Sequence, residues 1–158
     1  MGDTKLLAEI CDAIFHGILT TNKVILDRLY RNRDKDFPEE HEIKEQLTES
    51  IDELREWTDL HGGNLMKPYI VYSFLLAMIH LKGTVDSLNT VFPSPELKNF
   101  DVDRVTANLS LLSEALENPD AAGEFEGFVR ACTSRTNVKT QRENRFVWLC
   151  RALTTDFQ

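Results

Sequence analysis

The stretch PYIVYSFLLAMIHL, residues 68–81, decides the fold class of this 158-residue chain. Apolar side chains recur on every side of it when it is drawn as a helix: Ile70, Val71, Phe74, Leu75, Leu76, Met78 and Ile79. A helix without a polar face is normally buried among other helices. Pro68 suits the first turn of such a helix, and Gly83 suits its end. We therefore expect residues 68–81 to form the central helix of a bundle.

Amphipathic segments flank this central stretch on both sides. The clearest has apolar residues spaced by 4, 4, 3 and 3 positions: Ile43, Leu47, Ile51, Leu54 and Trp57. Further helices are predicted over about residues 4–16, 21–30, 101–117 and 120–132, and in a last segment for which Thr136-Asn137 offers an N-cap. Alternating strand patterns are almost absent. The pattern predicts an all-α, single-domain bundle of seven to eight helices.

The bulk composition is typical of one globular domain spanning residues 1–158. Hydrophobic residues make up 42% and charged residues 28%, which excludes a disordered chain. Three cysteines without a C-x-x-C pair indicate reduced thiols and a cytoplasmic location. No signal peptide pattern is present, and no apolar stretch is long enough to span a bilayer, so we expect no membrane contact. Met1-Gly2 before Asp3 resembles an expression start, which leaves open a C-terminal fragment of a longer protein.

The last fifth of the chain reverses the charge of the rest. Between Arg130 and Arg151 there are six basic residues and one acid, a net charge of +5 in a chain of net charge −8. Four of the six lie at i, i+4, i+7 and i+10, on one face of a helix or its entry: Arg135, Lys139, Arg142 and Arg145. Guanidinium groups bind phosphates, and Asn137 marks a helix start where backbone N–H groups are free. The sequence thus predicts a phosphate or nucleic-acid site at Arg135, Asn137, Lys139, Arg142 and Arg145.

Two other interpretations of this basic segment stay open. Asn137 can be a simple helix cap while the arginines pair with acidic residues of the same domain, of which the chain has 26. The basic face can also meet an acidic protein partner. No aromatic residue alternates with the charges, so stacking on single-stranded bases is not supported.

Three short motifs occur in an order that resembles one protein family. They are Leu26-Asp27-Arg28-Leu29-Tyr30, Tyr72-Ser73-Phe74-Leu75-Leu76, and Thr136-Asn137 followed by Arg142 and Arg145. The order is similar to the C-terminal helical region of GmrSD-like restriction proteins, whose N-terminal half is a ParB/sulfiredoxin-like domain. The resemblance implies a non-catalytic accessory domain of a DNA-targeting defence protein. The family's Asp-Gly-Gln-Gln-Arg motif is absent, so catalysis would belong to an N-terminal partner domain.

The remaining constellations favour structural roles. Tyr69, Ser73 and His80 share a polar line on the apolar stretch, which suits buried hydrogen bonds better than an enzyme pocket. The histidines lack metal-ligand spacing, so we expect no metal and no cofactor. The cysteines sit on apolar faces as small hydrophobic residues. If nucleic acid is not the ligand, the alternative is a protein-interaction or oligomerisation module with an apolar patch around Tyr30, Phe37 or Phe92.

Overall fold

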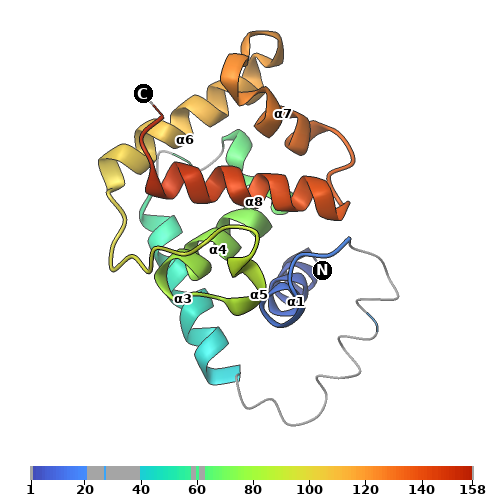
Figure 1. Ribbon diagram of the computed structural model, residues 1–158, viewed down its shortest axis with the longest axis vertical. Helices are drawn as coiled ribbons and strands as arrows, with labels where there is room; N and C mark the ends of the chain where they lie inside the picture. The colour runs from blue at the N-terminus through green and yellow to red at the C-terminus, as the bar shows by residue number, and fades with distance from the viewer. Residues whose placement is uncertain (1, 21–26, 28–39, 58–59, 61–62, 158) are drawn as a thin grey trace.

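The computed structural model describes residues 2–20, 27, 40–57, 60 and 63–157, and this part of the chain is helical without a strand. Its α-helices are α1 (Gly2–His16), α3 (Glu40–Glu56), α4 (Pro68–Lys82), α5 (Asp86–Asn89), α6 (Val102–Glu117), α7 (Glu126–Thr133) and α8 (Lys139–Thr154) (Figure 1). Short 3-10 turns precede α4 and lie between α6 and α7. The all-α prediction is confirmed. The predicted helix over residues 21–30 lies outside the described residues, apart from Asp27.

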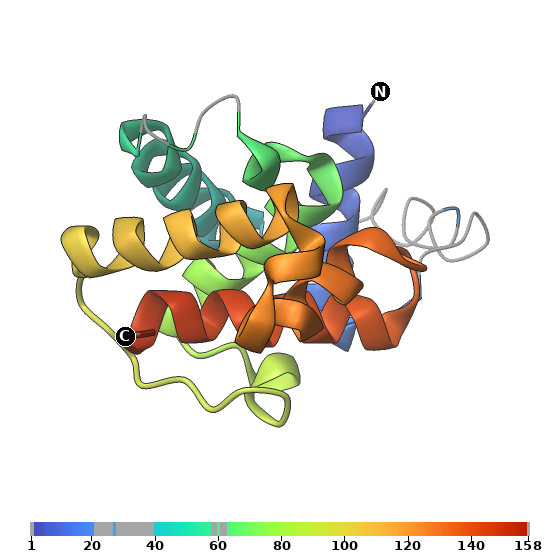
Figure 2. The same ribbon diagram turned by 90° about the horizontal axis from the view of Figure 1, so that it is seen from above.

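Helix α4 is the centre of the bundle. It packs against α8, α1 and α3 (Figures 1 and 2). Its side chains are buried from Tyr72 through Leu81 without interruption, so every face of the helix is covered. The Gly83 N–H closes its end by donating to the Ile79 carbonyl. The central position predicted from the apolar composition of residues 68–81 is confirmed.

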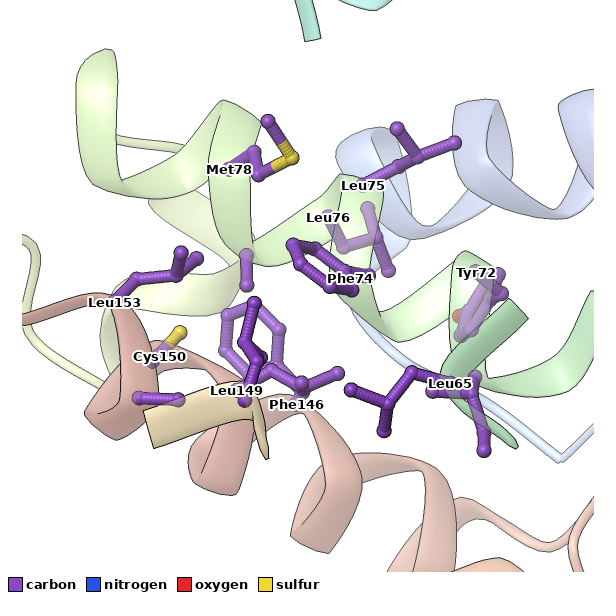
Figure 3. Close-up of a cluster of buried hydrophobic side chains, with 14 of the residues drawn as sticks. Leu65, Tyr72, Phe74, Leu75, Leu76, Met78, Phe146, Leu149, Cys150 and Leu153 are labelled. Atoms are coloured by element: carbon purple, nitrogen blue, oxygen red, sulfur yellow. The ribbon is translucent and has the colours of Figure 1, made fainter. Parts of the chain in front are cut away.

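The core forms where α4 and α8 face each other. Phe74 and Leu76 of α4 lie toward the buried side chains of α8, including Phe146 and Leu149 (Figure 3). Helix α3 adds Ile43, Leu47 and Leu54, and Trp57, directly after the last residue of α3, continues the same stripe. The Trp57 ring centroid lies 6.0 Å from that of Phe74. The 4, 4, 3, 3 spacing therefore identified the buried face of α3 correctly.

Helix α6 lies beside α8 and fixes its C-terminal end. Asp101 caps α6 by accepting a hydrogen bond from the Arg104 N–H. Asn108 is 1% exposed, and its amide donates to the carbonyls of Ala152 and Thr155. The last carbonyls of a helix have no partner within the helix. Asn108 supplies that partner from a neighbouring helix.

The start of α8 differs from the expectation. Val138 is the N-cap residue and makes no side-chain cap, so the prediction that Thr136-Asn137 caps this helix is wrong. The cap comes instead from Thr20, whose Oγ1 accepts from the Lys139 N–H at 2.9 Å. Thr20 is 119 residues away in sequence. A distant hydroxyl that satisfies the first amide leaves no signal in the local sequence.

Candidate functional site

Burial divides the predicted basic face of α8 into two parts. Arg142 is 5% exposed and Arg145 is fully buried. Arg135, Asn137 and Lys139 are exposed. The predicted phosphate contact at Arg142 and Arg145 is therefore wrong, because the side of α8 that carries these two arginines packs into the core.

Arg142 connects α8 to α1 and to the segment that follows α1. Its Nη2 donates to Glu9 Oε2 and its Nη1 to the Leu19 carbonyl, both at 2.8 Å. The guanidinium carbon lies 3.9 Å from the centroid of the Tyr72 ring. Burial raises the pKa of Tyr72 well above its usual value, so this phenol stays neutral. For Arg142, the internal pairing with an acid that we left open is what the structure shows.

Arg145 binds backbone carbonyls rather than an acid. Its Nη1 donates to the carbonyl of Ala131, in the last turns of α7, and its Nη2 to the carbonyl of Thr136 in the α7–α8 loop. Within the described part of the chain, no carboxylate forms an ion pair with it. A cation suits the carbonyl end of a helix, where the backbone dipole is negative. Burial lowers the pKa of Arg145, although a guanidinium remains charged.

The exposed remainder forms a corner at the beginning of α8, which we call the α8 corner: Arg135, Asn137 and Lys139. Lys139 is 58% exposed, and its Nζ lies 3.7 Å from Glu143 Oε1. Arg135 has a φ of +49°, a left-handed conformation that turns the loop toward α8. The first turn of α8 contains no acid. The N–H groups of Thr140 and Gln141 donate to no group among the described residues.

A pocket of about 310 Å³ adjoins the α8 corner. It is lined by Lys5, Leu6 and Glu9 of α1, by Pro68 and Tyr69 at the start of α4, and by Asn137 and Arg142. Glu9 Oε2 is engaged by Arg142, whereas Glu9 Oε1 is buried without a hydrogen-bond partner. Sequence analysis missed Lys5 and Glu9. No short motif connects α1 to α8, and only the packing brings them together.

The polar line of α4 has a structural role. The Tyr69 hydroxyl donates to the Cys132 carbonyl at 2.9 Å. His80 is fully buried, and its Nδ1 accepts from the Val85 N–H, so its protonated Nε2 donates to the Phe92 carbonyl at 2.6 Å. Burial lowers the pKa of His80. Ser73 is fully buried and its hydroxyl has no hydrogen-bond partner in the described structure.

Two of the three cysteines, Cys132 and Cys150, are buried in the core, as expected of small hydrophobic residues. Burial raises the pKa of Cys132 to about 12 and that of Cys150 well above its usual value, so both remain thiols. Cys11 is half-buried. Of the residues proposed for an apolar patch, Phe92 is half-buried, and Tyr30 and Phe37 lie outside the described residues.

The described residues hold no cluster of three or more histidine, cysteine or acidic side chains that could bind a metal ion. None of the helices described has both the length and the apolar character needed to cross a bilayer. Comparisons with protein-family models, curated proteins and solved structures found no match to this chain.

Proposed function

We propose that this chain is a non-catalytic helical binding domain that contacts the phosphate groups of a nucleic acid at the α8 corner. The observation that carries this proposal is the start of α8. Two backbone N–H groups without described partners lie there beside two exposed cations, in a first turn that contains no acid. A helix N-terminus of this kind favours an anion through both its free donors and its dipole.

The side chains of the α8 corner suit phosphate oxygens. Arg135 carries five N–H donors, and the amide of Asn137 adds two more. The pair between Lys139 and Glu143 is long and exposed, and such pairs contribute little to stability, so the ammonium can turn to a ligand. Phosphate contacts position a nucleic acid without identifying its sequence. We therefore expect binding that depends little on base sequence in a duplex.

The acidic remainder of the domain limits the contact to this corner. With a net charge of −8, the domain repels nucleic acid over most of its surface. Two cations that neutralise two phosphates predict a slope of about −2 for log K against log salt. The burial of Arg142 and Arg145 is the reason that the expected slope is this small.

The test is fluorescence anisotropy of labelled DNA oligonucleotides between about 50 and 200 mM salt. We expect Arg135→Ala/Lys139→Ala to reduce binding and flatten the salt slope. The matched control is Arg55→Ala/Lys98→Ala, which removes the same charge at exposed positions on α3 and in the α5–α6 loop. Equal losses in both variants, or binding that does not depend on salt, would contradict the proposal.

The defence role and the N-terminal catalytic partner are implied only by the GmrSD-like resemblance of the sequence, and both stay predictions. DNA contact at the α8 corner would agree with them. The non-catalytic character is supported by the engagement of Tyr69 and His80 with backbone groups. If oligonucleotides do not bind and the domain self-associates, the protein-interaction alternative replaces this proposal.

A further inference from the structure

The pocket beside the α8 corner has a different chemistry from the corner itself. Its walls include the apolar side chains of Leu6, Pro68 and Tyr69, whereas the corner is polar. Its volume of about 310 Å³ is at the small end of the range for ligand pockets. Asn137 belongs to both the pocket and the corner. A single ligand can therefore occupy the two at once.

Glu9 Oε1 is an atom in this pocket that lacks a hydrogen-bond partner. Its side chain is 13% exposed, and Arg142 engages only Oε2. Oε1 makes no hydrogen bond, and the Nζ of Lys5 lies 4.0 Å from it, beyond hydrogen-bond distance. A buried acceptor without a donor is unfavourable, so a ligand that supplies one gains affinity. Lys5 is 55% exposed and is free to move aside when the ligand enters.

The charges around Glu9 determine which kind of ligand group can donate a hydrogen bond to its Oε1. The Arg142 guanidinium would repel a cationic ligand, so a neutral donor fits better. Carboxylates accept hydrogen bonds from the amino group of cytosine, and adenine carries a comparable amino group. Uracil and thymine present a carbonyl at the corresponding position, which a carboxylate repels. Tyr69 adds an aromatic wall of the kind that contacts bases.

We infer that the pocket binds the base of a nucleotide with an amino group at C4 of cytosine or C6 of adenine, while the nucleotide's phosphate lies at the α8 corner. This inference rests on the proposed function for its phosphate contact. It adds a contact with an unpaired base, which a set of phosphate contacts alone would not provide.

The experiment compares CMP and AMP with UMP and inorganic phosphate by ¹⁵N-HSQC titration of the whole chain. We expect CMP or AMP to bind about fivefold or more tightly than UMP. The amide resonances of Leu6, Glu9 and Tyr69 should shift with the nucleotide but not with inorganic phosphate.

Glu9→Gln gives a sharper result than loss of binding. Arg142 holds the side-chain oxygen at this position, so the new NH₂ group takes the place of Oε1 and turns an acceptor into a donor. The base preference should then shift toward UMP. Glu143→Gln is the control, because it also removes one acid near α8 but does not line the pocket. Its base preference should equal that of the unaltered chain.

The outcomes separate this inference from the proposed function. Equal affinity for CMP, AMP and UMP overturns the inference, and so does the absence of nucleotide binding when oligonucleotides bind. The proposed function stands in both cases. If Glu9→Gln does not fold, Leu6→Phe narrows the pocket instead. This substitution should weaken the binding of CMP and AMP while leaving the binding of inorganic phosphate unchanged. An unchanged affinity for both nucleotides overturns the inference.

Discussion

Replacing the buried cation Arg145 with methionine tests the role that the structure gives it. Methionine keeps a long flexible side chain in the core but removes the donors to Ala131 and Thr136. A hydrogen bond from a charged group contributes roughly 1.5–3 kcal/mol. Removing a cation that has no carboxylate partner relieves a desolvation cost and offsets part of this loss. We therefore expect Arg145→Met to lower the free energy of unfolding by about 2–4 kcal/mol.

Urea denaturation followed by circular dichroism measures this change. The midpoint should fall while the m-value stays constant, because the surface exposed on unfolding hardly changes. Arg135→Met is the matched control. Arg135→Met makes the same chemical change at an exposed position. The free energy of unfolding should therefore change by no more than about 0.5 kcal/mol.

The reasoning would be refuted by an Arg145→Met variant as stable as the unaltered chain. That result would mean that the desolvation of the guanidinium equals the sum of its two hydrogen bonds. It would also be refuted if Arg135→Met were as damaging as Arg145→Met. Burial and the two backbone hydrogen bonds of Arg145 would then make no difference to the stability of the domain.

Three further substitutions test other contacts by the same denaturation assay. Thr20→Val removes the hydroxyl that caps α8 and should cost about 0.5–1 kcal/mol; no change would mean that solvent caps Lys139 equally well. Asn108→Ala removes two hydrogen bonds to the end of α8 and should cost about 2–3 kcal/mol, with faster amide exchange after Ala152; unchanged exchange would contradict this role. Burial lowers the pKa of His80, so the unfolded chain binds its proton more readily. The contribution of neutral His80 to the free energy of unfolding should be fully present above pH about 6.5. It should decline as the pH falls below that value, by at most about 1.4 kcal/mol per pH unit. His80→Gln should remove this part of the decline, and an identical slope in that variant would argue against His80 as its source.

The helical architecture was predictable because apolar spacing reports burial directly. The apolar stripe that runs from Ile43 in α3 to Trp57, directly after α3 ends, matches the buried face, with Ile51 half-buried. In α4 the absence of a polar face identified the central helix. Both inferences use only the geometry of one helix and the preference of apolar side chains for the interior.

The candidate site was less predictable because most partners of its two buried arginines are backbone carbonyls in other segments of the chain. Arg142 lies one turn before Phe146, and Arg145 one turn before Leu149, so each shares a side of α8 with a core residue. That overlap was a signal that these two cations are buried. The identity of their partners left no such signal, since Leu19, Ala131 and Thr136 act through their carbonyl groups.

The two buried arginines hold in place the backbone segments that form and cap the α8 corner. Arg142 holds the Leu19 carbonyl, next to Thr20, and Thr20 caps Lys139. Arg145 holds the Thr136 carbonyl between Arg135 and Asn137. Loss of either arginine should therefore weaken phosphate binding without removing a phosphate contact, because the corner would lose its support. Arg135→Ala and Lys139→Ala, by contrast, should lower phosphate affinity at constant stability, so the free energy of unfolding of each variant distinguishes the two effects.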